Sequence, residues 1–181
     1  MMDDWLVYVI GYPGSGKTTA MRAAIGMENR LGAGVQKQPF AHTVYPSGLV
    51  ELGYDRETYG GTDSLALNVQ PAVVKWLEDV AVPVIVGEGD RLANRKFFDA
   101  VVNLGRHLAI VHIKCDQATA KQRAWERGSR FNAAWLKGRI SKVDSLVTWC
   151  KDNCMLTEID GSAHPKDVGR ELATIIEGRS G

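Results

Sequence analysis

The stretch GYPGSGKTT, from Gly11 to Thr19, decides the fold of this chain. It follows the apolar run WLVYVI and precedes the helix-compatible segment AMRAAIGMENR. Its spacing, G-x-x-x-x-G-K-[ST], is typical of a loop that joins a strand to a helix and surrounds a phosphate with backbone N–H groups. A glycine-rich turn that binds nothing has no need of a lysine and a hydroxyl at fixed positions. The sequence therefore predicts a nucleotide phosphate site.

Each position of this loop has an expected role. The glycines allow positive φ and close backbone approach, and the helix start adds partial positive charge. We expect Lys17 to reach the β and γ phosphates of ATP or a similar nucleoside triphosphate, and the Thr18 hydroxyl to bind Mg²⁺. The residues expected to contact the nucleotide are Gly11, Pro13, Gly14, Ser15, Gly16, Lys17, Thr18 and Thr19.

The composition bounds the class of protein. The chain has 181 residues, 45% of them hydrophobic, and a formal net charge of +1. This predicts a single domain over residues 1–181, in which any nucleic-acid surface is local. The three cysteines lack a zinc-type spacing and fit a reducing compartment. Because the N-terminal apolar run is short and acidic residues precede it, we expect a cytoplasmic protein without a membrane span.

The order of apolar runs predicts an α/β fold. The runs VYVI, VPVIVG, LAIVHIKC and CMLTEI alternate with helix-like segments. Such alternation indicates a parallel sheet covered by helices. The stretch PFAHTVYPSGLVELG instead alternates with period two around Pro46, Ser47 and Gly48, which predicts an antiparallel hairpin inserted after the first helix. We expect this hairpin to form part of a flap on the substrate side.

Two helices with clear start signals follow the third of these runs. Asp116 is a good N-cap for QATAKQRAWERG, which Gly128 ends, and Asn132 caps AAWLKGRISKVDSLVTWC. Between residues 117 and 142 there are seven basic residues and one acidic residue. This is either a solvated helical face or a lid whose cations close over a phosphoryl group during transfer. We favour the lid, with three arginines as the best candidates: Arg123 on the nucleotide, Arg127 in catalysis, and Arg130.

One flank of the second helix combines an aromatic ring with cations. Trp135, Arg139 and Lys142 fall at i, i+4 and i+7 spacing. Tryptophans at such positions more often pack than stack on bases, yet the company of cations leaves a base-stacking role open for Trp135 and for Trp125.

Carboxylates follow another strand. The segment GEGDR places Glu88 and Asp90 at the carboxyl end of the run VPVIV, the edge at which ligands of open α/β sheets bind. One of them is expected to accept the proton of the acceptor hydroxyl or to hold Mg²⁺, with Asp90 as the metal candidate, while the other caps a helix. We expect Arg91 to steady the substrate or the transferring phosphate. Asp63, in YGGTDS, is either a second catalytic carboxylate or a helix cap.

These motifs together resemble a known family. The segments GYPGSGKTT, GYDRETYGGTDSLAL, VIVGEGDRL and RAWERGSRFNAAWLKGRISKV are similar to the bacteriophage P-loop kinases that phosphorylate 5-hydroxymethyluracil in DNA, relatives of thymidylate kinase. The resemblance covers most of the chain. It implies a three-layer sandwich with a mostly parallel sheet, an inserted β-hairpin and a helical lid over about residues 117–142. It also implies transfer of the γ-phosphoryl of ATP to the hydroxymethyl oxygen, in a phage-infected bacterial cell.

Two alternatives to this function stay open. DRL stands where thymidylate kinases carry DRY or DRF, which disfavours ordinary thymidylate recognition. A kinase for free nucleosides or nucleoside monophosphates shares the donor side and differs only in the acceptor pocket. A non-catalytic or ATPase-coupled module uses the loop to change shape, but the charge of the predicted lid disfavours it.

Overall fold

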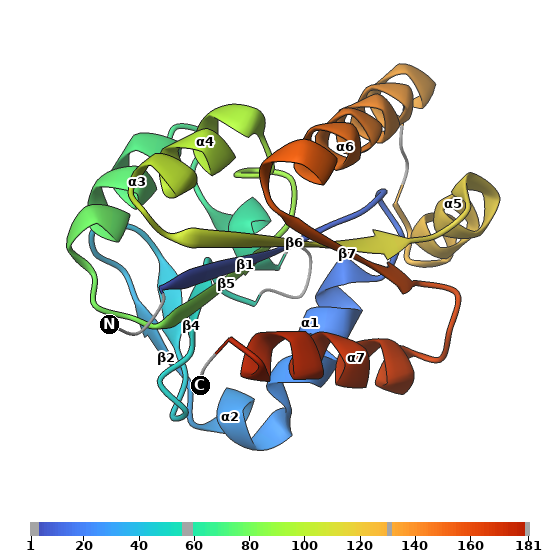
Figure 1. Cartoon of the computed structure of the whole chain (residues 1–181). Coiled ribbons are helices and arrows are strands. Elements are labelled where there is room, and N and C mark those ends of the chain that lie inside the picture. The colour runs from blue at the N-terminus through green and yellow to red at the C-terminus, as the bar shows by residue number, and fades with distance from the viewer. Residues whose placement is uncertain (1–3, 56–59, 130–131, 180–181) are drawn as a thin grey trace.

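The centre of the fold is a parallel sheet built around the strand that precedes the phosphate loop. In a computed structural model that describes residues 4–55, 60–129 and 132–179, seven strands form one sheet in the order β2-β3-β4-β5-β1-β6-β7 (Figure 1). The central strand β1 pairs in parallel with both β5 and β6. The strands are β1 Trp5–Ile10, β2 Gly34–Gln36, β3 His42–Val44, β4 Val50–Leu52, β5 Val84–Glu88, β6 His107–Lys114 and β7 Met155–Asp160.

Helices cover both faces of the sheet, because β1 is apolar on both sides. Leu6 and Tyr8 face a core shared with α3 (Gln70–Asp79), α4 (Arg95–Asn103) and the second half of α6 (Ala133–Asn153). Val7 and Val9 face a second core shared with α1 (Lys17–Ile25) and α7 (Pro165–Glu177). Figure 1 shows the sheet edge-on between these two helical layers. The predicted α/β class with a mostly parallel sheet is confirmed.

The hairpin is present, but the expectation that it forms a flap is wrong. β3 and β4 pair antiparallel around the predicted turn. β4 also pairs in parallel with β5, so the hairpin extends the central sheet. Val50 and Leu52 lie in the hydrophobic core. Between α1 and the hairpin lie the short helix α2 (Met27–Leu31) and β2.

The two helices of the predicted lid begin where their caps predict. Asp116 accepts a hydrogen bond from Thr119 N at the start of α5 (Gln117–Glu126), and Asn132 accepts from Ala134 N at the start of α6. Val143 and Cys150 of α6 are buried, whereas Leu136 is only half-buried. Among the helices of the three described ranges, none combines the length and hydropathy that a membrane crossing requires.

Candidate active site

The phosphate loop lies between β1 and α1 and is shaped by glycines. Gly14 has φ of 89°, and a Cβ there would lie 2.0 Å from the carbonyl oxygen of Ala120. Gly16 has φ of 97° and stands at the N-cap of α1. Ser15 is 1% exposed, and its Oγ has no hydrogen-bond partner within the described ranges. A glycine cradle with an unpartnered buried hydroxyl fits a bound phosphate.

Lys17 stands at the first turn of α1 and is held by the loop itself. Its Nζ donates hydrogen bonds to the carbonyl oxygens of Gly11 (2.9 Å) and Tyr12 (3.1 Å). Burial lowers the pKa of Lys17, and the nearby Glu88 carboxylate opposes that shift. A nucleotide phosphate offers this ammonium an anionic partner in place of two neutral carbonyls.

Thr18 and Glu88 join the loop to the end of β5. The Thr18 hydroxyl donates a 2.8 Å hydrogen bond to Glu88 Oε1, and Glu88 is 2% exposed. Burial raises the pKa of Glu88, while Lys17 and the bond from Thr18 offset part of this effect. A hydroxyl beside a carboxylate supplies the oxygen ligands that Mg²⁺ prefers, so these two residues fit a bound magnesium ion.

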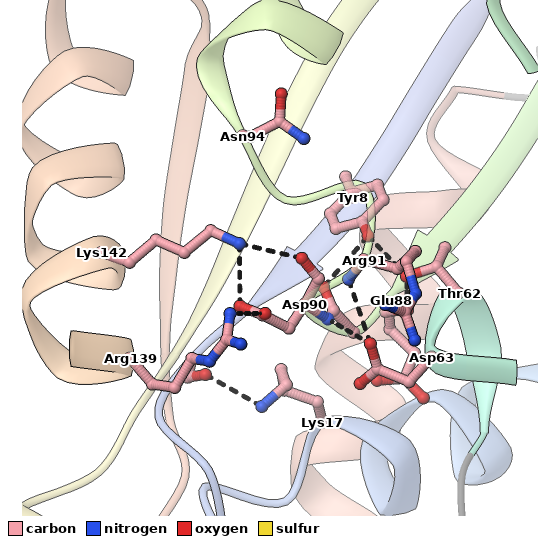
Figure 2. A network of polar contacts seen from close by, with 12 residues as sticks. Tyr8, Lys17, Thr62, Asp63, Glu88, Asp90, Arg91, Asn94, Arg139 and Lys142 are labelled. Carbon is pink, nitrogen blue, oxygen red and sulfur yellow. Dashed lines mark hydrogen bonds and ion pairs between the residues drawn. The ribbon is translucent and has the colours of Figure 1, made fainter. Parts of the chain in front are cut away.

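Asp63 organises the loop that follows Glu88. It lies in the short 3-10 helix η1 (Gly61–Ser64), and its Oδ1 accepts hydrogen bonds from the backbone N–H groups of Asp90 (2.9 Å) and Arg91 (3.0 Å). The buried Tyr8 hydroxyl bonds Thr62 Oγ1 and the Gly89 carbonyl, which ties the same two segments together (Figure 2). Asp63 thus caps this loop and still lies close to the end of β5.

Asp90 and Arg91 have different surroundings. The Asp90 carboxylate makes ion pairs with Arg139 and Lys142 of α6, so the geometry favours Glu88 over Asp90 as the carboxylate for a metal. The Nε of Arg91 is buried, and within the described ranges it has no hydrogen-bond partner. The backbone N–H of Arg91 bonds Asp63, and its unpartnered guanidinium nitrogen fits the expected contact of Arg91 with a substrate anion.

A pocket of about 300 Å³ opens beside the phosphate loop. Arg123 of α5 and Arg127, which follows directly after that helix, line its wall, and Arg123 Nη1 also donates a 2.7 Å hydrogen bond to the Gly161 carbonyl after β7. The other lining residues include Gly14, Ser15, Gly16, Thr19 and Pro165. Gly11 packs beneath the loop against Ser15, and Pro13 is half-buried. Arg130 lies outside the described residues.

Sequence reasoning missed a cluster beside this centre. Asp55, just after β4, accepts hydrogen bonds from Arg22 Nε (2.9 Å) and from Arg30 (2.7 Å). A Cβ on Gly60 would lie 3.6 Å from Asp55 Oδ1 and 3.4 Å from Glu88 Oε1, so Asp55 lies near the end of β5. No motif links the two arginines to Asp55, because the contacts depend on how α1 packs against the sheet.

Glu51, on β4 and 5% exposed, carries a pH-dependent cost to stability. Burial raises its pKa from 4.5 to about 7, although Tyr45 donates a hydrogen bond to it. The folded state binds this proton more tightly than the unfolded chain does, so protonation of Glu51 stabilises the folded state. This contribution is complete below the unfolded pKa and is lost as the pH rises through about 7, which lowers the free energy of unfolding by up to about 3 kcal/mol.

We predict that Glu51→Gln removes this loss, since glutamine keeps the shape of the neutral acid. Urea unfolding should show that the stability of the variant relative to the wild type grows by up to about 3 kcal/mol between about pH 4.5 and pH 8. Glu171→Gln, at an exposed position of α7, is the matched control. A constant difference between variant and wild type across this range would contradict the prediction.

Comparisons with known proteins agree with this geometry. The family described as P-loop Nucleotide Kinase3 matches residues 2–166. No curated protein matches the chain. A sugar kinase from Janibacter sp. HTCC2649 superposes with a TM-score of 0.57 and 13% identity, covering 98% of this chain and 96% of the other.

Two further solved structures are similar. A gluconokinase from Sinorhizobium meliloti 1021 has a TM-score of 0.55 and 16% identity, with 98% and 95% covered. A deoxyadenosine kinase from M. mycoides with bound dATP has a TM-score of 0.53 and 12% identity, with 95% and 99% covered. At these identities the likeness shows a shared fold.

Proposed function

Because the chain belongs to the P-loop nucleotide kinase family, we propose that it transfers the γ-phosphoryl group of ATP, or of a similar nucleoside triphosphate, to the hydroxymethyl oxygen of 5-hydroxymethyluracil in DNA. The observation that carries the transfer chemistry is the hydrogen bond between Thr18 and the buried Glu88, beside Lys17. The resemblance of four sequence segments supports the choice of acceptor. We treat residues 1–181 as one kinase domain, with a lid over about residues 117–142.

The donor side is assigned to the phosphate loop and the pocket next to it. Lys17 contacts the β and γ phosphates, and the loop N–H groups hold their oxygens. The pocket beside Gly14, Ser15 and Thr19 receives the nucleoside, with Arg123 and Arg127 on its wall. When bound, Mg²⁺ neutralises charge on the phosphates; Thr18 and Glu88 are the residues that would hold it. Arg127 stabilises the charge of the transferring group.

We assign the acceptor to the side of Glu88 that faces away from the donor pocket. The hydroxymethyl oxygen attacks the γ-phosphorus, the bond from that phosphorus to the bridging oxygen breaks, and the nucleoside diphosphate leaves. The hydroxyl proton passes to a carboxylate, for which we propose Asp63, because its Oδ1 is engaged by backbone while Oδ2 accepts no hydrogen bond within the described ranges. Arg91 steadies the acceptor.

A second candidate is a kinase for a free nucleoside or nucleoside monophosphate. The shared fold with a deoxyadenosine kinase and with sugar kinases favours it, since their named substrates are small molecules. The donor side is the same for both functions, so only the acceptor distinguishes them.

The deciding experiment compares acceptors at matched concentration. We expect transfer from labelled ATP to 5-hydroxymethyluracil to rise from the free nucleotide to a short oligonucleotide and again to a longer one, because a strand adds contacts to flanking phosphates. Thymine-containing oligonucleotides, which lack the hydroxyl, are the control. Equal or better transfer to the free nucleotide would overturn the DNA acceptor and leave the free-nucleotide kinase.

A further inference from the structure

The first half of α6 is an arm without a buried residue. None of the residues 133–142 is buried, and the buried side chains of this helix, Val143, Leu146 and Cys150, all lie in its second half. Apolar packing therefore fixes only the second half to the sheet. The arm carries the exposed Trp135, whose ring lies 5.2 Å from the guanidinium of Arg139.

Within the described residues, the ion pairs between this arm and the body of the protein share one carboxylate. Asp90 makes ion pairs with Arg139 and Lys142, and Lys142 Nζ also donates a 2.9 Å hydrogen bond to the Asp90 carbonyl. The three side chains are 28–36% exposed, so water reaches all of them. Two cations share one negative charge. Arg139 and Lys142 therefore carry enough positive charge to bind an anion of higher charge than a single carboxylate.

The position of the pair points to the acceptor. The pocket assigned to the donor contains no residue of α6, of η1 or of the loop after Glu88 among the lining residues of the described chain. Figure 2 shows Arg139 and Lys142 reaching from α6 to Asp90, with Glu88 and Asp63 on the other side of that loop. The two cations thus lie outside the donor pocket and beside the loop that follows Glu88.

We propose that Arg139 and Lys142 form a binding subsite for a phosphate group of the acceptor, and that Asp90 occupies this subsite until the acceptor arrives. The inference rests on the proposed function, because it requires an acceptor that carries a phosphate group. A phosphate resembles a carboxylate in presenting two oxygens to a guanidinium, and it carries equal or greater negative charge. Asp90 is then an internal competitor that lowers the apparent affinity for this phosphate.

The proposal predicts effects of opposite sign within one cluster. Asp90→Asn removes the competing charge at nearly constant volume and should tighten binding of phosphate-bearing probes by roughly tenfold. Arg139→Gln removes one cation of the subsite and should weaken binding of the same probes by roughly tenfold. If these ion pairs served only to hold the arm in place, both changes would weaken binding, because each breaks the ion pair between Arg139 and Asp90.

The experiment measures binding and transfer separately. Fluorescence anisotropy of labelled oligothymidylate gives dissociation constants without any transfer, and the KM values of 5-hydroxymethyldeoxyuridine, its 5′-monophosphate and an oligonucleotide containing the base give the substrate arms. Asp152→Asn, an exposed carboxylate near the end of α6, controls for net charge. If Asp90→Asn lowers the KM of the monophosphate more than that of the nucleoside, the subsite binds the terminal phosphate. If the variant tightens binding of the oligonucleotides alone, the subsite binds a backbone phosphate.

The outcomes separate this inference from the proposed function. Tighter binding by Asp90→Asn without transfer to any 5-hydroxymethyluracil acceptor would overturn the function and support the subsite. Weaker binding by both Asp90→Asn and Arg139→Gln would overturn the subsite whatever the transfer assay shows. If Asp90→Asn does not fold, as judged by circular dichroism, Arg139→Gln decides: a loss that is equal for the nucleoside and for its monophosphate contradicts a phosphate contact.

Discussion

Lys17→Ala will lower the rate of phosphoryl transfer by on the order of a hundredfold or more, while the protein stays folded. The side chain contacts two carbonyl oxygens of the loop and contributes nothing to the two apolar cores. Removing it deletes a preorganised positive charge beside the transferring phosphate, and the lost interaction is strongest in the transition state. Single-turnover transfer from labelled ATP measures the effect directly.

The matched control for this variant is Lys96→Ala, which removes an exposed lysine from α4. It changes the net charge equally and should transfer at the wild-type rate. Thermal unfolding of both variants checks the fold. A folded Lys17→Ala protein with wild-type turnover would remove the phosphate loop from the catalytic account.

Glu88→Gln and Asp63→Asn should impair different steps. Glu88→Gln keeps an oxygen for the Thr18 hydroxyl but removes the negative charge, so we expect the Mg²⁺ concentration for half-maximal rate to rise about tenfold or more. Asp63→Asn should lower kcat by roughly 10²-fold with little change in the KM for ATP, because a proton acceptor acts on the transferring step. Magnesium titrations of kcat for both variants separate the roles.

The pH dependence supplies an independent check on Glu88. Burial raises its pKa, so its negative charge is lost at a higher pH than that of an exposed glutamate as the solution is acidified. The magnesium requirement of the wild type should therefore increase on the acid side, and Glu88→Gln should lose this dependence. The opposite pattern, with Asp63→Asn shifting the magnesium requirement, would exchange the two assignments.

Local signals account for what the sequence predicts well. The phosphate loop, the caps at Asp116 and Asn132 and the parallel strands each depend on neighbouring residues, and the structure contains all of them. The hairpin at Pro46 was recognisable from its alternation. Its incorporation into the sheet was not, because alternation does not say which strand lies alongside β4.

Contacts between distant segments account for what the sequence did not reveal. Asp90 meets Arg139, a partner 49 residues away, and Asp55 meets Arg22, 33 residues away. Sequence reasoning placed Asp90 with the metal because it follows a strand, and Arg139 on a helix flank with Trp135 and Lys142. Their pairing depends on how α6 packs against the sheet, which no local pattern encodes. The sequence likewise did not decide whether Asp63 is a cap or a catalytic group, because its partners, the N–H groups of Asp90 and Arg91, are distant in the sequence.

The most direct test of the central claim follows the labelled γ-phosphoryl group of ATP in the presence of Mg²⁺ and an oligonucleotide that contains 5-hydroxymethyluracil. The account predicts that the label moves to the hydroxymethyl oxygen, in amounts equal to the diphosphate formed, and that Lys17→Ala lowers the rate at which both products form by on the order of a hundredfold or more. Release of the label only as inorganic phosphate, with the oligonucleotide and a panel of free nucleosides and nucleotides all unlabelled, would contradict a phosphotransferase and indicate an ATPase.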